Sequence, residues 1–124
     1  NVARVGGLLE AKKVAAIAEV YYAQIAPHLY NGPIGAAASI QLAACTPNFL
    51  IQESIGTWDG FHAAVLKKPI QWEDGYIIPS QEPGLGVELN MDVVRQHTPY
   101  TGERLHLQMA ARPADVKDLA PAKG

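Results

Sequence analysis

Residues 23–53 read AQIAPHLYNGPIGAAASIQLAACTPNFLIQE, with two short apolar runs separated by a longer one. The short runs at 23–27 and 48–52 have the length and apolar character of buried strands. Residues 31–33, Asn-Gly-Pro, are typical of a helix start, because Asn or Gly can cap the helix and Pro suits its first turn. Residues 34–45 are apolar almost throughout, which predicts a helix buried on several sides.

A further helix is expected over residues 8–22, after a Gly-Gly turn. Its charged residues fall mostly on one face, so the helix is predicted to be amphipathic. Helices and strands then alternate with short connections, which is the pattern of an α/β fold with a parallel sheet and crossover helices. Two strands cannot form a stable parallel sheet alone, because both faces and both edges need cover. We therefore expect the remaining strands to come from elsewhere.

The second half of the chain is predicted to be loop-rich and peripheral. Residues 1–57 hold six charged side chains, whereas residues 58–124 hold sixteen. The sequence predicts a short helix, two short extended pieces around a turn, and a second brief helix, in that order: 58–66, 69–72, 75–79 and 91–97. Residues 98–124 show no clear period and are predicted to be an irregular tail.

Composition excludes several classes of protein. With 48% hydrophobic and 18% charged residues, the chain is apolar enough to fold. The net charge is -2 and no basic run exceeds two residues, so neither a nucleic acid nor a membrane is expected as a partner. Cys45 is the sole cysteine, which excludes an internal disulfide and is compatible with a reducing compartment. Its place in an apolar helix predicts a small core residue.

Polar residues occupy the predicted strand ends. His28 follows the first strand, Glu53 follows the second, and Asn1 stands where a preceding strand would end. Parallel strands present their carboxyl ends at one edge, where α/β proteins assemble ligand sites. A histidine after a strand is more often an ordinary loop residue, but the three positions together predict a functional constellation. Trp58, just beyond, either lines the mouth of a pocket or simply packs.

These residues resemble the C-terminal third of the enolase superfamily. The mandelate racemase/muconate lactonizing enzyme group fits best, and within it the galactonate dehydratase-like sugar-acid dehydratases. The similar motifs are NVARVGG at 1–7, APH at 26–28, GPI at 32–34, PNFLIQE at 47–53, WEDGY at 72–76 and PGLGVEL at 83–89. The resemblance covers about residues 1–97, and although each motif is short, their order and spacing are specific.

The resemblance implies a capping domain and a modified TIM barrel, (β/α)₇β. Residues 1–57 would supply its last two to three strands with their crossover helices, and residues 58–97 would close it by packing back on the capping domain. Residues 98–124 would be the tail. The remainder of the barrel and the capping domain are then partners of this chain, in a cytoplasmic homo-oligomer.

The resemblance also implies a chemistry. Such enzymes use Mg²⁺ to stabilise the enediolate that forms when a base removes the proton α to a carboxylate. His28 would be the general acid/base, Glu53 would hydrogen-bond the substrate carboxylate or the enediolate, and Trp58 would contact the substrate. In the family an Asp usually stands at the position of Asn1 and pairs with the histidine. The negative charge of that Asp is missing here. The metal ligands lie on earlier strands, so this chain is expected to hold none.

Several functions remain open at this point. The first is dehydration of a sugar acid, an aldonate or aldarate, by the complete enzyme, with the isolated chain inactive. A racemase or epimerase of the same superfamily is the nearest alternative, because the same histidine can return the proton. A catalytically incompetent barrel fragment, acting as a structural module, is the second alternative. An unrelated small α/β binding domain ranks last, because it leaves the apolar helix without a larger body around it.

Overall fold

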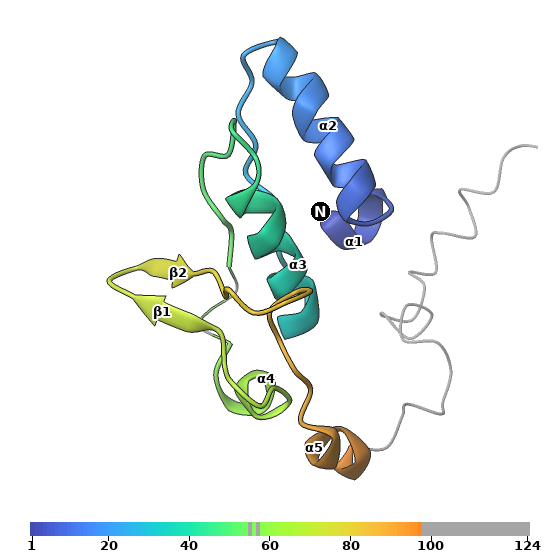
Figure 1. The fold of residues 1–124 in the computed structure, drawn as a ribbon, viewed down its shortest axis with the longest axis vertical. Coiled ribbons are helices and arrows are strands. Elements are labelled where there is room, and N and C mark those ends of the chain that lie inside the picture. The colour runs from blue at the N-terminus through green and yellow to red at the C-terminus, as the bar shows by residue number, and fades with distance from the viewer. Residues whose placement is uncertain (55, 57, 98–124) are drawn as a thin grey trace, which may run out of the picture.

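The computed structural model describes residues 1–54, 56 and 58–97, so the predicted tail lies outside the described residues. Helices dominate, and one antiparallel hairpin lies beside them (Figure 1). The elements in chain order are α1 (Val2–Val5), α2 (Leu8–Val20), α3 (Pro33–Ala44), α4 (Gly60–Ala64), β1 (Gln71–Glu73), β2 (Tyr76–Ile78) and α5 (Met91–Gln96). In this part of the chain, no helix has both the length and the apolar character needed to span a membrane.

The first helix, α1, is an element that the sequence pattern did not predict. Asn1 caps it, because its Oδ1 accepts a hydrogen bond from the Ala3 backbone N–H at 3.0 Å. Gly6 ends it in the left-handed region, with φ of 105°, where a Cβ would be strained. Asn1 is therefore fixed by the helix that follows it.

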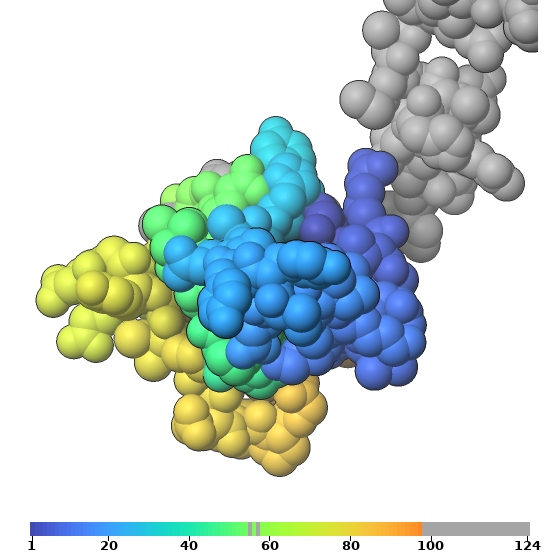
Figure 2. Space-filling model, turned by 90° about the horizontal axis from the view of Figure 1, so that it is seen from above, coloured from blue at the N-terminus to red at the C-terminus, as the bar shows by residue number. Residues whose placement is uncertain are grey.

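The predicted helix over residues 8–22 is confirmed as α2, but its burial differs from the prediction. Its small residues Ala11 and Ala15 are buried, and Ala11 packs with Val2 and Leu42 in a core shared with α1 and α3. The larger apolar side chains of α2 are exposed: Leu9, Val14, Ile17 and Val20. The helix thus packs through its alanines, which allow a close approach, and its bulky apolar side is open in the described part of the chain. Seen from above, the N-terminal residues, in blue, lie at the surface of the molecule (Figure 2).

The long apolar helix is confirmed as α3, which begins on Gly32 as N-cap with Pro33 in its first turn. Its buried residues point in several directions, as predicted: Pro33, Ala36, Ala37, Ser39, Ile40 and Leu42. The prediction that Cys45 lies in the core is wrong, since the residue is exposed. Cys45 is the C-cap that follows the last helical turn, so its side chain leaves the buried face.

The two predicted strands lie parallel but pair over a single bridge, between Ile25 and Phe49. The Ile25 N–H donates to the Asn48 carbonyl at 2.8 Å, and the Leu50 N–H donates to the Ile25 carbonyl at 2.9 Å. The predicted strands at 23–27 and 48–52 are therefore longer than the pairing in the structure. A parallel strand is held by neighbours on both edges, and each of these segments has one such neighbour in the described residues.

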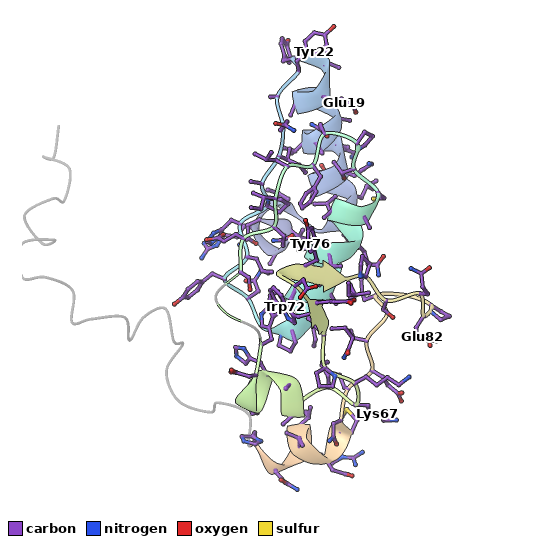
Figure 3. The ribbon with its side chains drawn as sticks, turned by 90° about the vertical axis from the view of Figure 1, so that its left-hand side faces the viewer. Glu19, Tyr22, Lys67, Trp72, Tyr76 and Glu82 are labelled. Atoms are coloured by element: carbon purple, nitrogen blue, oxygen red, sulfur yellow. The ribbon has the colours of Figure 1, made fainter. Side chains whose placement is uncertain are left out.

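The predicted extended pieces form the β1–β2 hairpin, which pairs Trp72 with Ile77. Asp74 and Gly75 have φ of 47° and 82°, as the tight turn between twisted strands requires. The hairpin lies alongside α3; Trp72 is the middle residue of β1, and Tyr76 begins β2 directly after the turn (Figure 3). The predicted helices 58–66 and 91–97 shorten to α4 and α5.

Candidate active site

The structure brings His28 and Glu53 together, although they are 25 residues apart in sequence. His28 Nδ1 lies 2.5 Å from Glu53 Oε2, and about half of each side chain is exposed. The parallel bridge between Ile25 and Phe49 places the two chain segments in register, so both side chains emerge at the same edge. A half-exposed imidazole held by a carboxylate can accept or release a proton toward a bound molecule.

The pKa of Glu53 is lowered from its ordinary value of 4.5. The main cause is the Leu29 backbone N–H, which donates to Oε2 at 2.8 Å and favours the charged form. Partial desolvation acts in the opposite direction, and the hydrogen bond and charge of His28 lower the pKa further. Glu53 is therefore a carboxylate at neutral pH.

The lowered pKa of Glu53 makes a prediction about stability. A carboxyl whose pKa is lower in the folded state than in the unfolded state stabilises the fold at every pH above its unfolded-state pKa. That stabilisation is lost as the pH falls through the folded-state pKa. We expect Glu53→Gln to be less stable than the parent at pH 7, with the difference shrinking below about pH 4.5. Urea unfolding of both proteins from pH 3 to pH 7 measures it, and a difference independent of pH would contradict it.

A polar network, which the sequence analysis missed, ties the two segments to α3. The Gln52 Nε2 donates to the Pro27 carbonyl at 3.0 Å and to the Glu53 carbonyl at 2.9 Å. Its Oε1 accepts a hydrogen bond from the Ser39 hydroxyl at 2.9 Å, and Ser39 is 1% exposed. The only signal in the sequence is a lone serine in an apolar helix, with a glutamine at the following strand end. The network holds the residues next to His28 and Glu53 at a fixed separation.

Gln52→Ala is expected to lower the free energy of unfolding by about 1–3 kcal/mol, because it leaves the buried Ser39 hydroxyl unpaired. The double variant Ser39→Ala/Gln52→Ala should cost less than the two single changes added together, since it removes both partners. Denaturant unfolding of the three variants completes the cycle, and strict additivity would show that the pair is not coupled.

Asn1 lines the same groove as His28, without bonding to it in the structure. Its Oδ1 is shared between the Ala3 N–H and Asn31 Nδ2, the latter at 3.4 Å. The groove has a volume of about 320 Å³, and its walls are mostly apolar: Val2, Val5, Ala11, Val14, Ala15, Ile25, Ala26, Pro27 and Leu42. Glu53 is not among the residues that line it.

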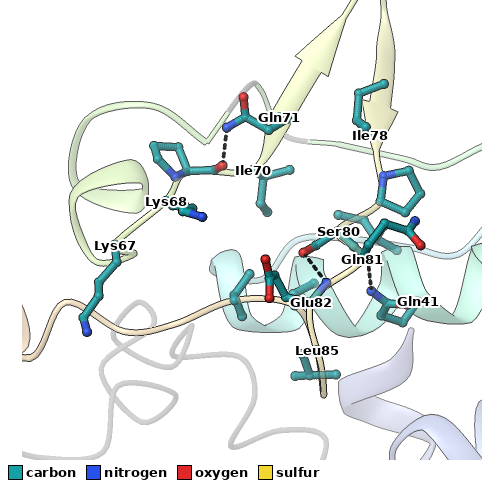
Figure 4. A pocket seen from close by; sticks show the side chains of 16 residues that line it. Gln41, Lys67, Lys68, Ile70, Gln71, Ile78, Ser80, Gln81, Glu82 and Leu85 are labelled. Carbon is teal, nitrogen blue, oxygen red and sulfur yellow. Dashed lines mark hydrogen bonds between the residues drawn. The ribbon is translucent and has the colours of Figure 1, made fainter.

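Trp58 lies in a core cluster and not on this groove. It is 4% exposed and packs with Leu29 and Ala36, and its ring lies 5.5 Å from that of Trp72. Its indole N–H is buried and has no hydrogen-bond partner among the residues that the structure describes. A separate cavity of about 500 Å³ lies between α3 and residues 67–87, away from His28 (Figure 4).

The described residues do not fit a Mg²⁺ site. In this part of the chain, no group of three or more His, Cys, Asp or Glu side chains is close enough to hold a metal ion. Mg²⁺ requires near-octahedral oxygen ligands, whereas Glu53 Oε2 is already bonded to His28 and to the Leu29 N–H. Any metal used with His28 must be held by residues outside the described part.

Residues 1–93 match the family described as Enolase C-terminal domain-like. The chain belongs to the enolase superfamily. Within it, the chain matches part of the C-terminal domain of the mandelate racemase/muconate lactonizing enzyme group. Over 98% of this chain, the backbone resembles a solved member of that group from Burkholderia SAR-1, with 83% sequence identity and a TM-score of 0.82. The chain covers 30% of that protein.

Curated relatives in the enolase superfamily include two kinds of enzyme. D-xylonate dehydratase of Haloferax volcanii is 36% identical over 76% of this chain, and muconate cycloisomerase 1 of Rhodococcus opacus is 41% identical over 75% of it. The chain spans about a quarter of the length of these relatives, 23% and 25%. An enolase from Pantoea ananatis, solved with D-gluconate and Mg, is 28% identical to this chain and matches it with a TM-score of 0.73. The match covers 82% of this chain and 25% of the Pantoea ananatis chain.

Proposed function

We propose that this chain supplies the proton-transfer edge of a sugar-acid dehydratase. The observation that carries the proposal is His28, half exposed and held by Glu53 at the edge where two parallel segments end. The relationship to D-xylonate dehydratase, and the gluconate in the Pantoea ananatis structure, support an aldonate or aldarate as substrate. We use the name complete enzyme for the longer protein that we propose to contain this chain. It would also contain the rest of a (β/α)₇β barrel and a capping domain, and it would form a homo-oligomer.

His28 is the general acid/base of the proposed reaction. The proton α to a carboxylate is very weakly acidic, so its removal requires a positioned base and stabilisation of the resulting enediolate. His28 accepts that proton, and the electron pair of the enediolate then expels the hydroxyl as the bond from the β-carbon to it breaks. The hydroxyl leaves as water with the proton that His28 returns. The resulting enol tautomerises to a 2-keto-3-deoxy acid. Glu53 acts beside His28, and a contact between Trp58 and the substrate stays a prediction for the complete enzyme, because Trp58 is buried in the core cluster here.

Mg²⁺ is part of the proposal, with its ligands outside this chain. When bound, it supplies positive charge that stabilises the enediolate. The support is the Mg in the Pantoea ananatis structure, together with the superfamily to which the chain belongs. This chain contributes the proton-transfer residues and the closing segment, residues 58–97.

The alternative is a reaction that moves the proton without expelling water, as in a racemase, epimerase or cycloisomerase. The observation that favours it is the 41% identity to muconate cycloisomerase 1. A structural module without activity is favoured by Asn1, because its neutral amide cannot support a positive charge on His28 as a carboxylate would.

The test is an activity screen of the complete enzyme against aldonic and aldaric acids with Mg²⁺ in D₂O. Formation of a 2-keto-3-deoxy acid is the expected result. Exchange of the α-proton for deuterium without loss of water would support the racemase or epimerase. No product and no exchange with any acid would contradict both, and would leave the structural module.

A further inference from the structure

The side of α2 that faces away from the core is exposed and largely apolar. Leu9 and Val20 are 69% and 74% exposed, and Ala16 between them is also exposed. With Lys13, they follow the spacing i, i+4, i+7 and i+11, so the side chains form one line along the helix, which we call the outer stripe. Lys13 Nζ bonds Glu10 at 2.7 Å, which leaves its apolar stem on the stripe. This spacing is that of the contact line between two helices in a coiled coil.

The outer stripe is separate from the sides of α2 that contact other parts of the chain. Ala11 and Ala15 are buried, and Val14 lines the groove beside His28, whereas no residue of the outer stripe lines that groove. The groove also contains Ile25, whose segment has a single parallel neighbour in the described residues. A further strand joining that segment would run along the groove side of α2. The outer stripe would then stay exposed, at the edge of the molecule where α2 lies (Figure 1).

The charges beside the outer stripe are placed unevenly along one flank of α2. Lys12 lies toward the N-terminal end of that flank, and Glu19 lies two turns later, toward the C-terminal end (Figure 3). Lys12 Nζ donates to the Cys45 carbonyl and to Thr46 Oγ1, which leaves one of the three hydrogens of its ammonium group. Glu19 is exposed and forms no ion pair among the described residues. The flank thus offers a donor at one end and an acceptor at the other.

A second copy of α2, running antiparallel across a two-fold axis, fits both the stripe and the charges. In such an interface residue i meets residue j, and j meets i. With the axis beside the middle of the helix, Leu9 of each copy faces Val20 of the other, and the small Ala16 lets the two backbones approach. Lys12 of each copy lies opposite Glu19 of the other. A parallel pair would place no lysine beside Glu19, because both lysines of α2 lie in its N-terminal half.

We propose that the outer stripe of α2 is an interface between two copies of the complete enzyme, formed by antiparallel pairing of α2 with α2. The proposal rests on the proposed function, in which the complete enzyme is a homo-oligomer. A helix of 13 residues is about 20 Å long, whereas a stable interface buries about 800 Å² on each partner. The stripe is therefore the centre of the interface, and surface beyond both ends of α2 supplies the rest.

The first test is analytical ultracentrifugation of the complete enzyme. Glu19→Lys places lysine opposite lysine at both ends of the interface, so the dissociation constant for self-association should rise at least about tenfold. Lys12→Glu/Glu19→Lys exchanges the two charges and should restore association. Glu82→Lys is the matched control, because it makes the same charge change at an exposed residue outside α2. A monomeric parent, or self-association unaffected by Glu19→Lys, would overturn the proposal.

The second test leaves Lys12 and its bonds to the end of α3 intact. Leu9→Cys/Val20→Cys is made in a Cys45→Ser background and oxidised with oxidised glutathione, and the linked peptides are identified by mass spectrometry. The two introduced thiols are roughly 16 Å apart along one helix, too far for a disulfide within a chain, so antiparallel pairing is expected to link position 9 of one copy to position 20 of the other.

Leu9→Cys alone in the same background should give no linked dimer. A link between the two copies of position 9 would show parallel pairing and overturn the proposal. The absence of any link between copies would also overturn it and would assign the stripe to the rest of the complete enzyme. Neither test needs a substrate, so the interface can fail while the proposed function stands, and an enzyme that turns over no sugar acid can still pair through α2.

Discussion

His28→Asn is expected to lower kcat of the complete enzyme by about 10²- to 10⁴-fold, the usual contribution of a general acid or base. Asn has no group that can take up a proton near neutral pH, while its amide keeps the polarity and much of the size of the side chain. The stability should change little, because the imidazole is about half exposed. Steady-state kinetics measures the loss, and deuterium exchange at the α-carbon should be lost in parallel.

The control for this prediction is another exposed histidine, His97, whose Nδ1 contacts the Val93 carbonyl at the end of α5. His97→Asn should retain the parent kcat, because it lies on a different element from the paired segments. If His28→Asn turned over substrate at the parent rate with its fold intact, His28 would not be the base. The proton would then have to be taken by a residue outside the described part of the chain.

Local signals predicted the elements whose geometry depends on few neighbours. The Gly32-Pro33 pair marks the start of α3, and Asp74-Gly75 marks the turn of the hairpin, because each fixes backbone angles within its own residues. The four-residue α1 gave no periodic signal because it is too short to show one. Its cap, Asn1, also stands where the sequence predicts that a preceding strand ends.

Features that depend on distant or external partners were harder to predict. The sequence predicts the parallel pairing but not its length, since strand length depends on neighbours that the described residues do not contain. The sequence does predict that His28 and Glu53 lie close together, because each follows one of two successive parallel strands. The bond from Leu29 to Glu53, which sets the charge of that carboxylate, appears only once the backbone is placed.

Trp58→Ala is expected to lower the free energy of unfolding by about 3–5 kcal/mol, because it empties a buried aromatic site. The ring is 4% exposed and packs on Trp72, Leu29 and Ala36, so its loss removes contacts from the residue that follows His28. The effect should therefore reach activity through the fold, with a lower unfolding midpoint in urea and a smaller active fraction.

Trp58→Phe separates packing from substrate binding. Phe keeps most of the apolar surface and removes the indole N–H. That group is buried with no partner in the described part of the chain, which costs about 1–3 kcal/mol in the folded state. If Trp58 only packs, the loss of this unpaired donor offsets the lost ring area, so Trp58→Phe is close to the parent in stability and in KM. If Trp58 contacts a bound sugar acid in the complete enzyme, KM rises several-fold with stability unchanged. The ratio of the two KM values, measured on the complete enzyme, decides between the two roles that the sequence left open for this residue.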